Sequence, residues 1–202
     1  MDTVRRAAPS VLDPAEADLL GKARGGNLLA FEEIVRRYQR RVYAVAFRIV
    51  RRHDVADDVT QEAFIRAHQA LGSFDLSRPF GPWICRIAAN QAINHVRSPE
   101  SREEPLPEGY AEEPSADAGP EARVLEREGR EALQRALHAL PAEQRTVFVL
   151  RVYEELSYRE IAEALGLSMG TVMSRLSRAR EKLRVVLEPY LGAALRRAGG
   201  EP

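Results

Sequence analysis

The sequence has very little of the chemistry that disulfides and metal sites require. It contains one cysteine, Cys85, and four histidines, at positions 53, 68, 95 and 138, among 202 residues. One cysteine cannot form an internal disulfide, and these histidines do not have the spacing of a metal-ligand set. Glycine-rich phosphate loops and nucleophile elbows are also missing. We therefore expect no catalytic centre, no metal and no cofactor, and we interpret Cys85, within the apolar stretch WICRIA, as a buried thiol.

Long apolar runs are missing as well. No stretch approaches the run of about twenty apolar residues that a membrane-spanning helix needs. The first residues, MDTVRRAAPSVLDP, also lack the apolar segment of a signal peptide. We expect a cytoplasmic protein with no membrane insertion.

The chain has no net charge, but its charges are segregated. In total, 30 basic residues balance 30 acidic ones. Residues 100–121 hold eight acids and one arginine, whereas residues 166–187 hold five basic residues and one acid. A basic face of this kind is typical of a nucleic-acid binder, and the acidic connector offsets its charge.

Residues 157–187 carry the strongest motif, SYREIAEALGLSMGTVMSRLSRAREKLRVVL. Ser157, with Glu160 three residues later, predicts a capping box, and Gly166 suits the left-handed residue that ends a helix. Ser168 can then cap a second helix, whose apolar residues recur at a spacing of three and four. Its other faces are basic, so the pair predicts a helix-turn-helix whose second helix enters the DNA major groove. An ordinary helical hairpin with a solvated basic face is the alternative, but the coincidence of caps, turn and basic face favours DNA.

The rest of the sequence predicts helices and therefore an all-α protein. Asp13, Asn27 and Asp54 are predicted N-caps, and Trp83 and Pro141 are predicted to begin two further helices. A proline-rich acidic stretch predicts a flexible linker between two small helical domains. The predicted organisation is a first domain at 1–97, the linker at 98–121, a second domain at 122–192 and a frayed tail at 193–202.

The predicted third helix, residues 54–71, has a ridge of acids and amides. Its members are Asp57, Asp58, Gln61 and Glu62. The ridge fits a basic protein partner, although a solvated face explains these residues equally well. Either Ile65 or Phe64 can face the core from this helix.

Amides and arginines occupy the polar side of the helix predicted after Trp83. They are Arg86, Asn90, Gln91, Asn94 and Arg97. The preceding loop, residues 72–82, contains Phe74 and Phe80, which a plain linker would not need. Amides can read base edges, arginines can hold phosphates and a loop can clamp an unstacked base, so this stretch suits single-stranded nucleic acid.

Seven arginines decorate the predicted second helix, which runs to about residue 52. We interpret most of them as a charged outer face: Arg36, Arg37, Arg40, Arg41, Arg48, Arg51 and Arg52.

Four segments, in this order, resemble a bacterial sigma factor of the small two-domain extracytoplasmic-function (ECF) type. They are FEEIVRRYQRRVYAVAFRIV, DVADDVTQEAFIRAHQAL, PFGPWICRIAANQAINHVR and LPAEQRTVFVLRVYEELSYREIAEALGLSMGTVMSRLSRAREKL. Each segment alone is a weak pattern, whereas four in one order with a linker between them form a specific one. The resemblance covers roughly residues 28–187 apart from the linker.

The resemblance implies an alternative sigma factor and not an enzyme, because RNA polymerase performs the chemistry. The first domain resembles sigma-2, which binds polymerase and the −10 promoter element, and the second resembles sigma-4, which binds the −35 element. The implied partners are core RNA polymerase, through its β′ coiled-coil and β flap, and promoter DNA. An anti-sigma factor, which is common in the family, is implied as well.

Site residues are implied by the same resemblance. Docking on the β′ coiled-coil is implied for Asp57, Asp58, Gln61 and Glu62. Melting of the −10 element with capture of a flipped base is implied for Phe74, Arg86, Asn90, Asn94 and Arg97. Contact with the −35 element is implied for Thr171, Met173, Ser174, Ser177 and Arg178, with Arg175 and Arg180 on phosphates.

Two positions depart from the family pattern. Met173 and Ser177 stand where some relatives carry a longer basic or an aromatic residue. A methionine can pack against a thymine methyl but cannot make a bidentate base contact, so the upstream DNA sequence stays open. The competing interpretation is a transcription regulator that binds duplex DNA only. Such a regulator would not need the amide- and aromatic-rich stretch at residues 72–97.

Overall fold

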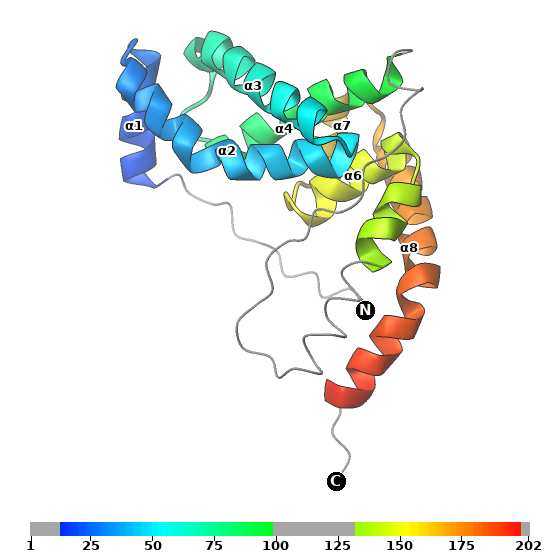
Figure 1. The fold of residues 1–202 in the computed structure, drawn as a ribbon. Helices are drawn as coiled ribbons and strands as arrows, with labels where there is room; N and C mark the ends of the chain where they lie inside the picture. Colours follow the sequence, from blue (N-terminus) through cyan, green and yellow to red (C-terminus); the bar gives the residue numbers. More distant parts are fainter. Residues whose placement is uncertain (1–12, 99–131, 199–202) are drawn as a thin grey trace.

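The computed structural model describes residues 13–98 and 132–198, with side chains described as far as residue 188. Every regular element in these ranges is a helix, which confirms the predicted all-α class (Figure 1). The elements are α1 (Pro14–Arg24), α2 (Leu28–Val50), α3 (His53–Ala70), the short 3-10 helix η1 (Leu71–Ser73), α4 (Phe80–Arg97), a helical segment at 132–139, α6 (Ala142–Val152), α7 (Tyr158–Leu165) and α8 (Met169–Ala198). The predicted linker and the start of the helix predicted at 122–139 lie outside the described residues.

The first two helices begin at their predicted caps. The Asp13 carboxylate accepts a hydrogen bond from the Ala15 N–H at 3.1 Å, and the Asn27 side chain accepts one from the Ala30 N–H at 3.1 Å. Each bond satisfies a donor that the first turn of a helix leaves without a partner. The prediction of both start points is confirmed.

Three other boundaries differ from the prediction. α3 begins at His53 with Arg52 as its N-cap, so Asp54 lies in the first turn and is not the cap. There its carboxylate accepts a hydrogen bond from the Arg52 Nε at 3.2 Å, which lowers the pKa of Asp54. α4 begins at Phe80, three residues before Trp83, because Pro82 in the first turn costs no helical hydrogen bond. α8 continues to Ala198, past the start of the predicted frayed tail.

Helices α2, α3 and α4 form the N-terminal half by packing against one another. Ile34, Val45 and Ile49 of α2 are fully buried in this core, together with Ile84 of α4. An aromatic group closes one end of the core, where the Phe74 ring lies 4.5 Å from Trp83 and 5.7 Å from Phe80. Cys85 is buried and free, as the sequence predicts.

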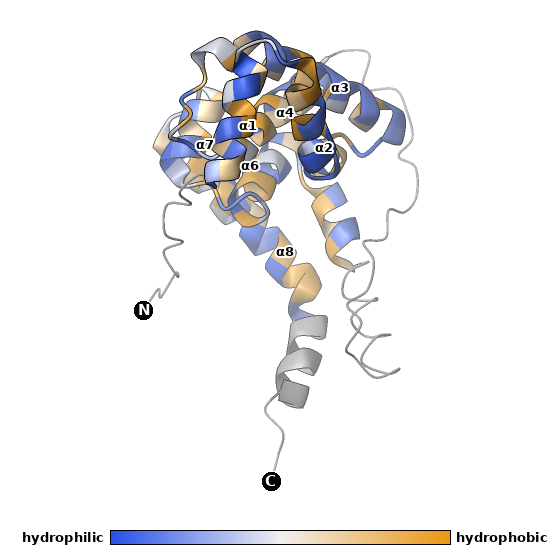
Figure 2. Cartoon of the chain, turned by 90° about the vertical axis from the view of Figure 1, so that its left-hand side faces the viewer, coloured by the Kyte–Doolittle hydropathy of each residue, from blue (hydrophilic) through white to orange (hydrophobic). Residues whose placement is uncertain are grey.

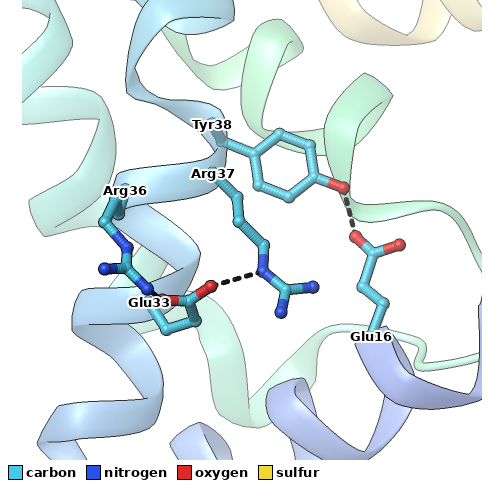
Figure 3. A network of polar contacts seen from close by, with 5 residues as sticks. All are labelled: Glu16, Glu33, Arg36, Arg37 and Tyr38. Carbon is cyan, nitrogen blue, oxygen red and sulfur yellow. Dashed lines mark hydrogen bonds and ion pairs between the residues drawn. The ribbon is translucent and has the colours of Figure 1, made fainter.

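Figure 3 shows polar contacts along α2. One attaches α1 to α2, and the others pair two of the arginines of α2 with a glutamate of the same helix. The Tyr38 hydroxyl donates a hydrogen bond to the Glu16 carboxylate of α1. One turn earlier, Glu33 accepts hydrogen bonds from Arg36 and Arg37, the latter at 2.8 Å. These two arginines are therefore paired within the helix on its exposed side, in line with the predicted outer face.

The C-terminal half consists of α6, α7 and α8, and α8 extends away from the rest of the molecule (Figure 1). Val172 and Leu176 of α8 are buried against α6 and α7. Further along α8, Ala179 and Leu183 pack on Leu137 of the helical segment at 132–139 and on Leu140, which directly follows that segment. The long helix is thus anchored by one apolar stripe.

The two halves are packed together. Helix α6 lies against α2 and α4, and α7 contacts α4. Val147, Val149 and Leu150 of α6 belong to the same apolar core as α2 and α4. Apolar segments face inward along this contact, whereas polar ones dominate the outside (Figure 2).

Candidate nucleic-acid interface

Three local hydrogen-bonding motifs stabilise α7, the turn after it and the start of α8. Ser157 Oγ accepts the Glu160 N–H at 3.2 Å while the Glu160 carboxylate accepts the Ser157 N–H at 2.8 Å, so the predicted capping box is present. Gly166 has a φ of 62°, the left-handed conformation in which its N–H bonds to the Ala162 carbonyl. The Ser168 hydroxyl then accepts the Thr171 N–H at 3.1 Å at the start of α8. The predicted helix-turn-helix is confirmed in every one of these details.

Packing determines which face of α8 is presented outward. Val172 is fully buried and Leu176 is 2% exposed, against a fully buried Ile161 in α7. The residues between these apolar positions must then face away from α7. The spacing of three and four between the apolar residues of α8 therefore determines both its buried stripe and the face that it presents outward.

Most of the residues predicted to contact the −35 element lie on this outward face. Exposed members are Met173, Ser174, Ser177, Arg178 and Arg180, whereas Thr171 and Arg175 are half-buried. The Ser174 hydroxyl donates to the Thr171 carbonyl at 3.1 Å, so part of its hydrogen-bonding capacity is used within the helix. All seven residues come from the first three turns of α8.

The arginines of this face differ in what they contact. Arg184 pairs with Glu181 at 2.8 Å, which neutralises it locally. Arg178 and Arg180 have no acidic partner in the ranges that the structure describes. Arg175 has its Nη1 atom buried without a hydrogen-bond acceptor. The positive charge available to phosphates thus lies near the start of α8.

A groove adjoins this face. It has a volume of about 460 Å³, and its walls come from Tyr158 of α7 and from α8 residues that include Met173, Ser177 and Arg180. Met173 is 52% exposed and, with Leu176 and Tyr158, gives the groove apolar surface beside the polar Ser177 and Arg180. This arrangement fits the apolar contact with a thymine methyl expected of Met173.

The predicted docking ridge occupies the exposed side of α3. Asp57, Asp58 and Gln61 are exposed, and the Glu62 carboxylate accepts a hydrogen bond from Arg66 at 2.6 Å. Ile65 lies on the same face, seven residues after Asp58, and is 52% exposed.

The structure also decides which of two apolar neighbours on α3 enters the core. Phe64 is buried and Ile65 is exposed, which settles the alternative that the sequence left open. The ridge therefore combines acids with an apolar residue that the sequence interpretation did not include. The helical period did not predict that Ile65 is exposed, because Phe64 and Ile65 both fit the apolar stripe of α3 approximately.

The residues predicted to act on the −10 element form a single row on α4. Arg86, Asn90, Asn94 and Arg97 are spaced by four, four and three residues, so they share one helix face. Arg86 and Asn90 are half-buried, and Asn94 and Arg97 are exposed. Arg97 lies 3.7 Å from Glu143 of α6.

Phe74 does not belong to this row. It is 5% exposed and packs against Trp83 and Phe80, so its ring is part of the core and offers no surface to a base. In this structure Phe74 therefore has a packing role, and its contact with DNA stays a prediction. The sequence signal, an aromatic residue in a polar loop, is the same for both roles.

These three groups of residues stay on separate elements, namely α3, α4 and α8. Within residues 13–98 and 132–198, no three histidine, cysteine, aspartate or glutamate side chains are grouped so that they could hold a metal ion. The same ranges contain no helix long and apolar enough to cross a membrane. What the structure offers is three dispersed surfaces, two of them suited to nucleic acid by charge and hydrogen bonding.

Comparisons with known proteins agree with this arrangement. The family described as "Sigma-70 region 2" matches residues 34–103, and the family described as "Sigma-70, region 4" matches residues 130–183. The first match contains α3 and α4, and the second contains the helix-turn-helix.

Three curated relatives are 35–36% identical to this chain over the residues that align. The RNA polymerase sigma-H factor of Pseudomonas aeruginosa is 35% identical over 89% of this chain and 97% of its own length. The ECF RNA polymerase sigma factor SigW of Bacillus subtilis is 36% identical, over 79% of this chain and 89% of its own. The ECF RNA polymerase sigma-E factor of Escherichia coli K12 is 36% identical, with coverages of 86% and 94%.

Two solved structures share the fold. CnrH in complex with the cytosolic domain of CnrY has a TM-score of 0.59 and 30% identity, and covers 87% of this chain and 98% of its own. The sigma factor RpoE of Bartonella quintana, in complex with the anti-sigma factor NepR, has a TM-score of 0.57 and 25% identity, with coverages of 78% and 96%. This chain belongs to the ECF family of RNA polymerase sigma factors.

Proposed function

We propose that this protein is an alternative sigma factor that binds core RNA polymerase and directs it to a class of promoters. It would act in the cytoplasm with the polymerase. It would contribute no catalytic group, because the polymerase performs the chemistry. The observation that carries the proposal is the capped helix-turn-helix, which presents Arg178 and Arg180 outward with no acidic partner among residues 13–98 and 132–188.

Recognition of the −35 element is assigned to the start of α8. Thr171, Met173, Ser174, Ser177 and Arg178 would face base edges in the major groove, and Arg175 and Arg180 would hold phosphates. Met173 would select a thymine by contact with its methyl group. Five of these seven side chains are exposed, which supports their contact with DNA.

Opening of the −10 element is assigned to the row on α4. Asn90 and Asn94 would hydrogen-bond an unstacked base, while Arg86 and Arg97 would hold the strand by its phosphates. Capture of an unpaired base removes it from the duplex, so binding energy is converted into strand opening. Phe74 is left out of this surface because it is buried.

Docking on the polymerase is assigned to the ridge on α3. Asp57, Asp58, Gln61 and Glu62 would meet a basic partner surface, which we take to be the coiled-coil of the β′ subunit. A second contact, between the C-terminal half and the β flap, would position α8 at the −35 element. Ile65 would add an apolar contact at the C-terminal end of the ridge.

A protein inhibitor is a further part of the proposal. CnrH and RpoE were each solved with a bound protein, the cytosolic domain of CnrY and the anti-sigma factor NepR. This chain shares their fold, so we propose that an anti-sigma factor binds it as well.

In vitro transcription tests the function directly. Core polymerase alone should give no specific start, and core polymerase with this chain should start at the promoters that the chain selects. A duplex-only regulator is distinguished by a second measurement, the binding of this chain to core polymerase without DNA. Failure to bind core polymerase, or to produce a promoter-dependent start, would reject the proposal.

A further inference from the structure

Two arginines are buried where the end of α2 meets the start of α6. Arg51 directly follows α2 and is 2% exposed, and Arg145 in the first turn of α6 is 7% exposed. Arginine is almost never fully buried unless an acid pairs with it. Among residues 13–98 and 132–188, no carboxylate pairs with either of these guanidinium groups.

Another arginine of α2 shows the usual arrangement. Both the Nε and the Nη2 atom of Arg41 lie 2.8 Å from the Glu154 Oε2, and the Glu154 side chain is only 3% exposed. One buried acid therefore offsets one cation between α2 and the turn after α6. Arg51 and Arg145 instead place two like charges near each other, so they need a counter-charge of another kind.

Unpaired polar atoms gather around the two arginines. In the described residues, five side-chain polar atoms are buried without a hydrogen-bond partner, and three of them are the Nε atoms of Arg51 and Arg145 and the Nε2 atom of His138. The other two belong to Gln144 and Arg175. The His138 carbonyl accepts a hydrogen bond from the Arg145 Nη1 at 3.2 Å, which keeps these two residues together. Native proteins leave few such atoms, and a group of nitrogen donors in one place indicates an acceptor that binds there.

The charge of the pair persists at neutral pH. Burial lowers the pKa of both arginines to about 10, and the charge of Arg145 contributes to the effect on Arg51. Because both values stay well above 7, the pair carries two positive charges in neutral solution. Water would satisfy the nitrogen atoms but leave this charge without compensation, whereas an anion would do both.

The backbone of Arg51 is held in an uncommon conformation. Its φ of 70° lies in the left-handed region, which residues other than glycine seldom adopt. In this conformation its N–H bonds to the Phe47 carbonyl at 2.9 Å, and its guanidinium lies 5.4 Å from the centroid of the Phe47 ring. Such conformations persist only where the surrounding structure enforces them, often at binding sites. The turn after α2 thus keeps this guanidinium inside the protein, near Arg145.

The chemistry and the burial of the pair restrict the ligand. Guanidinium groups bind phosphate oxygens through paired N–H donors, and two of them match the two negative charges of a phosphate group. Side chains that are 2% and 7% exposed are out of reach of the backbone of a DNA duplex or the surface of a folded protein. The ligand must therefore be small. Inorganic phosphate and the terminal phosphate of a nucleotide share this chemistry.

We propose that Arg51 and Arg145, with His138 beside them, form a binding site for a small phosphate anion. Each guanidinium would donate from its Nε atom to a phosphate oxygen, and the anion would offset both charges. Because the arginines come from the end of α2 and the start of α6, the bound anion would also stabilise the folded chain. The site belongs to the free chain and does not depend on the proposed function in transcription.

Thermal unfolding of the full chain is the first test. Melting temperatures are measured at one pH and one ionic strength, with chloride, acetate or phosphate as the anion. Phosphate at ten times its dissociation constant should raise the Tm of the parent chain by about 3 °C or more relative to chloride. Acetate, which carries a single charge, should raise it much less.

Methionine variants separate the site from the general stabilisation of proteins by phosphate. Arg51→Met and Arg145→Met should each lose most of the additional shift. In chloride, Arg51→Met should be at least as stable as the parent chain, because it removes one of two buried like charges. Arg40→Met changes an exposed arginine of α2 and should retain the full shift as the matched control. Circular dichroism confirms that each variant remains folded.

Direct binding is measured by phosphorus-31 NMR titration, with inorganic phosphate and ATP as separate ligands. The parent chain and Arg40→Met should bind one phosphate ligand per chain. Arg51→Met should bind it about tenfold or more weakly, because a charge-assisted hydrogen bond is lost. Tighter binding of inorganic phosphate would assign the site to the free anion, and tighter binding of ATP would assign it to a nucleotide.

Three results would overturn the inference. One is a shift in Tm with phosphate that the folded Arg51→Met and Arg145→Met chains retain in full. Another is stabilisation of the parent chain by acetate as large as that by phosphate, which would assign the pair to a carboxylate. The third is a titration that does not saturate, or that gives the same dissociation constant for the parent chain and Arg51→Met. A failure of the proposed function would appear elsewhere, as an absence of promoter-dependent transcription.

Discussion

Arginines of the same helix differ in whether an acidic side chain pairs with them. On α8, Arg184 is paired with Glu181, whereas Arg178 has no acid beside it in the described ranges. On α2, Arg37 is held by Glu33 and Arg41 by Glu154 of the other half. The sequence predicts how many cations a helix carries, but their partners depend on side chains that only the folded chain brings close.

Arg178→Ala should weaken binding to the upstream promoter element. Loss of a base contact costs about 1–3 kcal/mol, roughly 5- to 150-fold in affinity. Arg184→Ala is the matched control and should have a smaller effect, because Glu181 already offsets that charge. The measurement is the affinity of the holoenzyme for promoters with an intact or a scrambled −35 element. Equal losses on both DNAs for Arg178→Ala would contradict its role in base recognition.

Asn90→Ala should impair strand opening more than initial docking, because the amide is assigned to an unpaired base. Opening is followed by the fluorescence of 2-aminopurine in the −10 element, and docking by retention of the closed complex at low temperature. Gln69→Ala, an exposed amide at the end of α3, serves as the control. An equal loss at both steps would argue against the proposed division between α4 and α8.

At the scale of elements, the helix-turn-helix is the part that the sequence predicted best. Its geometry depends on contacts within four residues, such as Ser157 with Glu160 and Ser168 with Thr171. The starts of α3 and α4 were misplaced by one and three residues, because Arg52 and Pro79 are N-caps without a side-chain hydrogen bond. A cap without side-chain chemistry leaves no signal in the sequence.

Two glycine substitutions separate conformational strain from packing. Gly166→Ala should destabilise the protein by about 1 kcal/mol, because alanine disfavours the positive φ there. Gly21→Ala, within α1, should stabilise it by about 0.5–1 kcal/mol, since alanine is the better helix former. Neither added Cβ would meet an atom within 4 Å, so only the backbone differs. Urea denaturation measures both, and changes of the same sign would refute the explanation.

At the scale of the whole molecule, packing between the halves was not predicted. The apolar stripes of α2, α4 and α6 indicate that each helix has a buried side, but not which helix covers it. Arg41, Arg48 and Arg51 look like surface residues in the sequence, since arginine is seldom buried. Only the structure shows Glu154 and Tyr153 opposite two of them. The packing of the two halves therefore depends on long-range contacts that periodicity does not encode.

Because α6 shares an apolar core with α2 and α4, the parent chain should unfold in a single transition. Differential scanning calorimetry measures this, and agreement between calorimetric and van't Hoff enthalpies is the criterion. Glu154→Gln should broaden the transition or divide it in two, since it loosens the contact between the halves. Two resolved transitions in the parent chain would show that the halves fold independently.

The shared core also bears on how long the factor survives in the cell. Val147, Val149 and Leu150 are buried in a core that both halves share, and part of this apolar surface would meet water in a variant whose halves came apart. Proteases and chaperones act on such surfaces. A substitution that loosens the contact between the halves, such as Glu154→Gln, would therefore shorten the lifetime of the factor in the cell. The contact between the halves would then help to set the amount of this factor in the cell, in addition to its role in holding the fold together.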